Sequence, residues 1–268
     1  VFLSGNEADV AVHPDYRRMG IYNRMKTLQG ELLQNAGIKF LFGIESNPIL
    51  IKKNLEGGPD MVFPQAPIIL IKVQDIDLHL RMMDINIARN KIYGLKIIKF
   101  YNKIMNKLKV KNKLENKIRI LDVSQFDDSI DDFWNEIKRQ YNFIVERTRA
   151  YLNWRYRDPS GGNYLVKQAL ENGKILGYIV LRINRYLKGY PRGYIVDMLT
   201  LPDRLDATDA LVGEALSYFD TSDVNIVQCQ IIRNHYFNDI LKRHGFIDSR
   251  LRILANHRHS PEIDEEIK

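Results

Sequence analysis

The segment at residues 17–22 constrains the fold more than any other part of this sequence. An apolar run at residues 8–12 precedes it, and apolar residues at helical spacing follow: Ile21, Met25, Leu28 and Leu32. This pattern predicts a strand, a loop and then a helix. The first N–H groups of a helix have no partners within the helix, and the helix dipole adds partial positive charge there. Such a helix start favours phosphate, and Gly20 lets a ligand approach the backbone closely.

This loop resembles the pyrophosphate loop of the GNAT superfamily of N-acetyltransferases. The family pattern is Arg/Gln-x-x-Gly-x-Gly/Ala after a strand ending in Val-x-Pro, and residues 12–21 here read VHPDYRRMGI. At the last position the family has a small residue, whereas this chain has Tyr22. The resemblance implies that the loop binds acetyl-CoA through Arg17, Arg18, Met19, Gly20, Ile21 and Tyr22. An ordinary strand–helix connection with a basic turn is the alternative.

The composition is typical of a soluble globular protein, with 45% hydrophobic and 27% charged residues. The single cysteine, Cys229, excludes a disulfide framework and favours a reducing, cytoplasmic location. No apolar stretch reaches the roughly 18 residues that a membrane-spanning helix needs, and no signal peptide opens the chain. The chain begins at Val1 without an initiator methionine, so we expect a fragment or a trimmed sequence.

The net charge of +7 is concentrated in one segment. Residues 89–119 contain eleven lysines and arginines and one acid, Glu115, so this segment carries +10 and the remainder −3. Within it, apolar residues at helical spacing oppose lysines, which predicts a basic amphipathic helix over 96–108. Such a helix can lie on an anionic membrane or dock on its own domain with a solvated basic face. No accompanying aromatic and basic platform supports nucleic acid.

The two halves of the chain show the same order of predicted elements: strand, helix, strand, short helix and strand. In the first half, strands are expected at 8–12, 39–44 and 66–73. In the second, helices at 128–140 and 148–156 precede strands at 164–170 and 174–183, joined by an Asn172-Gly173 turn. Further strands are expected at 194–201, 225–230 and 251–254, the last closing the sheet, with helices at 207–219 and 235–243.

Matching landmarks support an internal duplication. Pro14 and Asn47 are 33 residues apart, while Pro202 and Asn234 are 32 apart. Two unrelated α/β units with similar loop lengths would give the same pattern.

The second half also resembles a GNAT domain. Asn234, Tyr236, Leu241 and the Gly245-Phe246 ending are similar to that family's closing helix. Its loop has no Arg-x-x-Gly, and the acids at 203, 206 and 209 would repel pyrophosphate. The resemblance therefore implies an α/β fold of tandem GNAT-like mixed sheets flanked by helices, with a degenerate second half. The first half would begin at the family's fourth strand and so lack its N-terminal strands. The expected domains are 1–75, a basic helical linker at 76–122, and 123–268.

The resemblance also implies where the cofactor and the base lie. Backbone groups of Val10, Ala11 and Val12 would hold the thioester arm, and Asn47 would contact it where the two central strands part. Three carboxylates near these strands are candidate bases: Glu7, Asp9 and Glu45. Turn or edge carboxylates are the plainer interpretation of each. The tyrosine that often reprotonates the thiolate in this family is missing, because residues 50–53 read LIKK.

Candidate acceptor residues lie on the predicted helix 148–156. Tyr151 and Arg155 share one face of it, and an aromatic ring beside arginine suits a sugar or an acidic acceptor, although both could equally anchor the core. The six histidines form no metal set, and His257 and His259 fall near a charged tail that we expect to be disordered. No metal is predicted, and Cys229 is expected to be a buried packing residue.

The leading hypothesis is an N-acetyltransferase that uses acetyl-CoA and an amine acceptor, with an amino sugar or a cell-surface precursor as candidates. One alternative is a non-catalytic binding or scaffold module with the same fold. Another is the related tandem class that transfers amino acids from tRNA to peptidoglycan precursors. An anionic membrane is a candidate partner for residues 89–119, nucleic acid is not favoured, and the oligomeric state is open.

Overall fold

The computed structural model describes residues 3–7, 11–56, 61–63, 65, 67–74, 78–79, 117–251 and 253–259. The chain forms two compact units. The first comprises residues 1–68 with 250–268, and the second comprises residues 69–249. These units divide the chain differently from the domain boundaries expected from the sequence. The predicted amphipathic helix at 96–108 lies outside the described residues.

The first unit contains a four-stranded sheet in the order β1-β2-β11-β3. β1 and β2 pair in parallel, and β11 is antiparallel to both of its neighbours, β2 and β3. The elements of this unit are β1 (Ser4–Glu7), a 3-10 turn (Pro14–Tyr16), α1 (Ile21–Asn35), β2 (Phe40–Glu45), α2 (Pro48–Leu55), β3 (Met61–Val62) and β11 (Leu254–His259).

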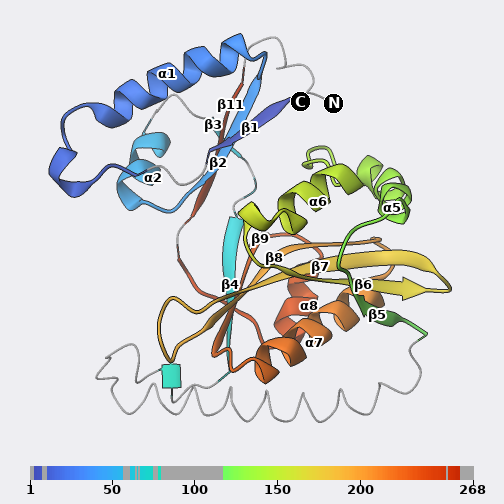
Figure 1. Ribbon diagram of the computed structural model, residues 1–268. Coiled ribbons are helices and arrows are strands. Elements are labelled where there is room, and N and C mark those ends of the chain that lie inside the picture. Colours follow the sequence, from blue (N-terminus) through green and yellow to red (C-terminus); the bar gives the residue numbers. More distant parts are fainter. Residues whose placement is uncertain are drawn as a thin grey trace. The chain divides into compact units, whose positions relative to one another are not determined.

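The second unit contains a seven-stranded sheet in the order β10-β4-β9-β8-β7-β6-β5. Helices α5 and α6 lie on one face of this sheet, and α7 and α8 on the other (Figure 1). Its elements are β4 (Pro67–Val73), β5 (Arg119–Asp122), α5 (Ser129–Ile137), α6 (Arg149–Arg157), β6 (Leu165–Glu171), β7 (Lys174–Asn184), β8 (Arg192–Thr200), α7 (Leu205–Thr221), β9 (Ile226–Ile232), α8 (Phe237–Arg243) and β10 (Ile247–Asp248).

The two sheets exchange strands. β4, from the first half of the sequence, lies between β9 and β10 of the second unit, and β11, from the C-terminal part, lies between β2 and β3 of the first (Figure 1). The prediction that residues 251–254 close the second sheet is therefore wrong. The apolar residues of 251–254 are followed by mostly polar ones in β11, and pairing with β2 buries Asn256 and His257 in the first sheet.

His257 is also not in a disordered tail. It lies in β11, 9% exposed, with its ring stacked 5.6 Å from Phe40 and 4.5 Å from Phe63. These contacts make β11 part of the core of the first unit.

Most other elements form where the sequence predicts them. Thr148 accepts a hydrogen bond from the Tyr151 N–H as the N-cap of α6, and Asn172 and Gly173 both have positive φ in the β6–β7 turn. The apolar positions of α5 are buried: Ile130, Phe133, Trp134 and Ile137. In α1, by contrast, the predicted apolar stripe is half exposed, with Met25 at 46%, Leu28 at 55% and Leu32 at 59%.

The predicted strand at 8–12 is displaced toward the N-terminus. β1 ends at Glu7, residues 8–10 lie outside the described residues, and Ala11 and Val12 are not in a strand. Two local features stop a strand here, because the Val12 carbonyl accepts a hydrogen bond from Arg17 Nε at 3.3 Å and Pro14 has no N–H to offer a neighbouring strand.

Deletion of residues 250–268 should unfold the first unit and spare the second, because it removes an interior strand from one sheet only. Amide exchange in β2 should accelerate at least roughly 100-fold, while β7 and β8 keep their protection. Exchange followed by mass spectrometry measures both in one sample. Leu251→Ser, at a position 62% exposed in the same segment, is the control that should leave β2 protected. Unchanged β2 protection in the deletion variant would contradict this role of β11.

Candidate functional site

The loop before α1 makes a sharp turn with two residues in the left-handed region. Arg18 and Gly20 both have positive φ, 66° and 75°, so the chain turns sharply between the 3-10 turn and the helix. Gly20 is the N-cap of α1, and no side chain caps the helix there. A Cβ at Gly20 would meet nothing within 4 Å, so the space in front of the helix start is open. Oriented N–H groups and open space are what a phosphate needs.

The equivalent loop of the second unit is closed by ion pairs. Arg204 is the N-cap of α7, and its guanidinium lies 2.9 Å from both Glu171 Oε2 and Asp206 Oδ2. The hydrogen bond from Arg204 lowers the pKa of Asp206, so this carboxylate stays charged in front of the helix. This helix start therefore presents an anion rather than space for one.

The structure gives the predicted first-half residues different surroundings. Glu45 ends β2, and its Oε1 accepts hydrogen bonds from the N–H groups of Ser46 at 2.8 Å and Asn47 at 2.6 Å. Asn47 caps α2 by accepting from the Ile49 N–H at 2.9 Å. Both side chains thus shape the turn where β2 ends. The Glu7 side chain, Asp9 and Val10 lie outside the described residues.

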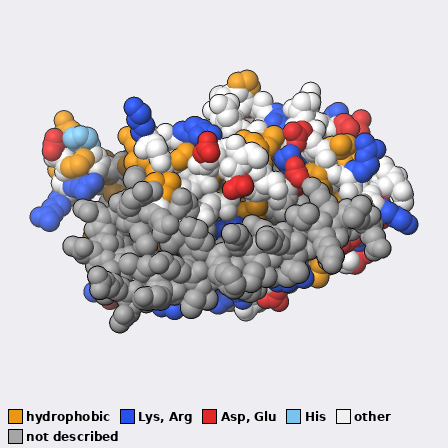
Figure 2. All heavy atoms as spheres, turned by 90° about the horizontal axis from the view of Figure 1, so that it is seen from below, with side chains coloured by type: hydrophobic (Ala, Val, Ile, Leu, Met, Phe, Trp, Pro, Cys, Tyr) orange, Lys and Arg blue, Asp and Glu red, His pale blue; other side chains and the backbone are white. Residues whose placement is uncertain are grey.

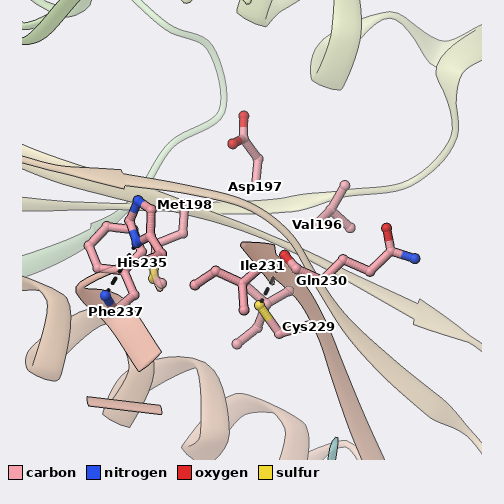
Figure 3. A pocket seen from close by; sticks show the side chains of 9 residues that line it. Val196, Asp197, Met198, Cys229, Gln230, Ile231, His235 and Phe237 are labelled. Carbon is pink, nitrogen blue, oxygen red and sulfur yellow. Dashed lines mark hydrogen bonds between the residues drawn. The ribbon is translucent and has the colours of Figure 1, made fainter. Parts of the chain in front are cut away.

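A cavity of about 140 Å³ opens in the second unit where β8 and β9 separate. The two strands pair in parallel only over 192–195 and 226–229, although both continue beyond. The lining consists of residues 195–198 of β8, residues 229–231 of β9, and two aromatic residues, His235 and Phe237 (Figure 3). Separated parallel strands give access to backbone groups that are normally paired.

Asp197 carries the charge in this lining and belongs to a buried polar cluster. Its Oδ2 accepts hydrogen bonds from the hydroxyls of Tyr156 and Tyr178, both at 3.0 Å, and lies 3.0 Å from Arg147 Nε. Figure 3 shows its side chain pointing away from Cys229, which lines the other side of the cavity. One buried carboxylate is therefore matched by one guanidinium and two hydroxyl donors.

Burial and charge together fix the protonation of this cluster. Burial alone would lower the pKa of Arg147, but the Asp197 carboxylate raises it overall, so the guanidinium stays charged. Burial, and then the Asp197 charge, raise the pKa of both Tyr156 and Tyr178. Both tyrosines therefore remain neutral donors at physiological pH.

The other titratable groups of the cavity are neutral. Burial lowers the pKa of His235 to about 4, and its Nδ1 accepts a hydrogen bond from the Phe237 N–H at 3.2 Å. Burial raises the pKa of the Cys229 thiol to about 12, which confirms the expected packing role of this residue. Arg147, which is not part of the lining, balances the charge of Asp197, the one charged side chain among the described residues that line the cavity.

Tyr151 and Arg155 do not line this cavity. The Arg147 guanidinium carbon lies 5.6 Å from the ring centroid of Tyr151, and the Arg155 guanidinium carbon lies 5.8 Å from the ring centroid of Tyr156. Trp154, on the same helix, is 64% exposed and 5.7 Å from Tyr151 between ring centroids. Helix α6 therefore presents aromatic side chains beside arginine. Its Tyr156 does not line the cavity itself but donates a hydrogen bond to Asp197, which does.

Sequence reasoning missed the Asp197 cluster. The available signal was an acid inside an apolar strand, since residues 195–198 read IVDM. By the correspondence of Pro14 with Pro202, Asp197 also occupies the position of Asp9, which was singled out as a candidate base.

Among the described residues, no group of three or more His, Cys, Asp or Glu side chains converges on a metal site. None of the helices in that part of the chain is long and apolar enough to cross a membrane.

Asp197→Leu should destabilise the protein by ~3–5 kcal/mol, because it leaves the Arg147 charge buried without its partner. Urea denaturation measures the change. Glu136→Ala is a matched control, since its pair with Lys174 is 45% and 57% exposed and should contribute less than ~1 kcal/mol. Equal losses in the two variants would show that Asp197 does not compensate a buried charge.

The model of the "Acetyltransferase (GNAT) family" matches residues 127–205. This range runs from α5 to the first residue of α7 and includes β8 with Asp197. A sequence search finds no match among curated proteins.

Solved structures share the fold across nearly the whole chain. A tandem GNAT protein from the clavulanic acid biosynthesis pathway is 14% identical, with a TM-score of 0.54 over 96% of this chain and 75% of its own. A probable N-acyltransferase from Enterococcus faecalis V583 is 17% identical, with a TM-score of 0.54 over 96% of this chain and 55% of its own. N-myristoyltransferase from Saccharomyces cerevisiae with bound myristoyl-CoA is 10% identical, with a TM-score of 0.61 over 95% of this chain and 59% of its own.

This chain thus spans between 55% and 75% of the length of these structures. It shares the fold of these structures, among them a tandem GNAT protein, and the GNAT family model matches one part of it, residues 127–205.

Proposed function

We propose that this protein is an N-acyltransferase that transfers an acyl group, acetyl in the simplest case, from coenzyme A to an amine. The observation that carries the proposal is the open, left-handed turn at Arg18 and Gly20 in front of the uncapped start of α1. Arg17, Arg18, Met19, Gly20, Ile21 and Tyr22 would hold the pyrophosphate there. The contrast with the closed loop at Arg204 supports a single coenzyme A site, in the first half.

The reaction needs few groups. The amine nitrogen attacks the thioester carbonyl carbon, the carbon–sulfur bond breaks, and the thiolate takes up a proton while the amine loses one. Ala11, Val12 and Asn47 would position the thioester arm, together with Val10. Asp9 is our first choice of base, because Asp197 of the second half holds the corresponding position in a sheet. Glu7 and Glu45 are the other candidates, and Glu45 would need to give up its turn contacts.

The second half would recognise the acceptor. The exposed aromatic surface of α6, formed by Tyr151 and Trp154 beside Arg155, suits the ring of an amino sugar or of a cell-surface precursor. The cavity beneath Asp197 would take an uncharged part of the same molecule.

Gly20→Glu should weaken coenzyme A binding at least about 100-fold. A carboxylate about 4 Å from a phosphate costs roughly 4 kcal/mol at an effective dielectric constant near 20, and a side chain at φ 75° adds strain. Titration calorimetry with coenzyme A measures the affinity. Gly30→Glu places the same charge in the interior of the same helix, where a Cβ also meets nothing within 4 Å, and should leave the affinity within about threefold. Equal affinities in both variants would place the pyrophosphate elsewhere.

Arg155→Ala should raise the acceptor KM about tenfold without changing acetyl-CoA affinity, the pattern expected when a group contacts only the acceptor. Steady-state kinetics and calorimetry measure the two quantities. Arg182→Ala removes a comparable arginine, 5.6 Å from the Tyr164 ring centroid, and should change neither. If Arg155→Ala unfolds the protein or leaves the kinetics unchanged, Arg155 is structural.

One assay separates the alternative functions. Release of free coenzyme A is followed with acetyl-CoA and longer acyl-CoA donors against a panel of amines and amino sugars. Turnover that depends on an amine supports the proposal, and the preferred donor identifies the acyl length. Binding of coenzyme A without turnover would indicate a non-catalytic module, and transfer only from aminoacyl-tRNA would indicate the related peptidoglycan class.

A further inference from the structure

Two hydrophobic side chains in the turn between β7 and β8 are exposed to solvent. Tyr186 is 90% exposed and Leu187 is 44% exposed. The turn itself is fixed, because Asn184 Oδ1 accepts from the Tyr186 N–H at 2.8 Å and the Tyr190 N–H donates to the Leu187 carbonyl at 3.1 Å. A rigid backbone therefore presents these side chains rather than burying them.

Cations surround this tip. Residues 182–192 contain four of them and no acid: Arg182, Arg185, Lys188 and Arg192. Arg185 is held at the end of α7, where its Nη2 donates to the Ser222 carbonyl at 3.1 Å, close to Asp220 and Asp223 in sequence. Lys188 lies next to Leu187 and is exposed, as are Arg182 and Arg192. Hydrophobic groups and positive charge are thus presented together.

His79 contacts the chain just after this tip. His79 is hydrogen-bonded to the Tyr190 hydroxyl, and their rings stack with centroids 6.1 Å apart. Burial, and then the nearby Arg192 charge, lower the pKa of His79, so this contact adds no charge of its own. Ten residues further along the sequence begins the segment 89–119, with its charge of +10.

In Figure 2, acidic and basic side chains are interspersed over the described part of the face seen from below. At the tip, by contrast, the exposed charged residues of 182–192 are all basic. A partner that accepts two hydrophobic side chains near cations would fit there.

We infer that the tip at residues 185–188 inserts into the surface of an anionic lipid bilayer. Tyrosine prefers the headgroup level, leucine reaches the acyl boundary, and lysine and arginine contact lipid phosphates. Basic residues beside a membrane attract anionic lipid at roughly 1 kcal/mol each, so the exposed Lys188 next to Leu187 would add to the binding. RNA is less well matched, because Leu187 offers no stacking surface and one tyrosine makes no platform. This inference is independent of the proposed acyl transfer.

Sedimentation with vesicles tests it. Wild-type protein should bind vesicles of phosphatidylcholine with 30% phosphatidylserine at 150 mM salt, and bind pure phosphatidylcholine much less. Tyr186→Ser with Leu187→Ser should weaken this binding about tenfold and leave the thermal midpoint unchanged. Leu251→Ser, at an exposed leucine in the first unit, is the matched control and should bind like wild type.

A spectroscopic readout reports insertion directly. Tyr186→Trp should shift its emission to the blue on anionic vesicles, after subtraction of the wild-type spectrum from Trp134 and Trp154. Three results would overturn the inference: no sedimentation with anionic vesicles at low salt, equal binding by the Tyr186/Leu187 double variant and wild type, or tighter binding to tRNA that anionic vesicles do not displace.

Discussion

The backbone pairing of β11 is the interaction on which the rest of the structure depends. This strand pairs with β2 from Leu254 opposite Glu45 to His259 opposite Phe40 and also pairs with β3, so it is an interior strand of the first sheet. Without it, two strands would expose unpaired N–H and carbonyl groups. Its pairing ends opposite Glu45, two residues before Asn47. The turn proposed to contact the acyl donor is therefore held by residues from the C-terminal part of the chain.

In the second unit, the separation of β8 and β9 places a carboxylate in a largely buried position. Opening a sheet exposes polar groups, and a lone carboxylate there would be costly to bury. Arg147 and two tyrosines compensate Asp197, while His235 and Cys229 stay neutral for reasons of burial. The result is an opened sheet in which the charge of Asp197 is compensated by Arg147. A compensated carboxylate at this opening is compatible with the acceptor role proposed for the second half.

Local signals in the sequence were sufficient for the individual elements. The helix starting at Ile21, the Thr148 cap and the Asn172-Gly173 turn depend on residues within a few positions of one another. The strand exchange depends on pairing between segments far apart in the sequence, and the polar sequence of β11, LANHRH, carries no strand pattern that predicts its partners. The Asp197 cluster joins residues 19, 41 and 50 positions apart. No local pattern encodes such contacts, although the acid within residues 195–198 marked one end of them.

The exchanged strand also sets the order in which the molecule can be completed during synthesis. Domains usually fold as they emerge, with the N-terminal one first. Here the first unit lacks an interior strand until residues 254–259 have left the ribosome, whereas the second unit has all of its strands once β10 has been made. The unit encoded first is therefore finished last. In the meantime β2 and β3 present open edges of the kind that pair with other chains, until β11 covers them.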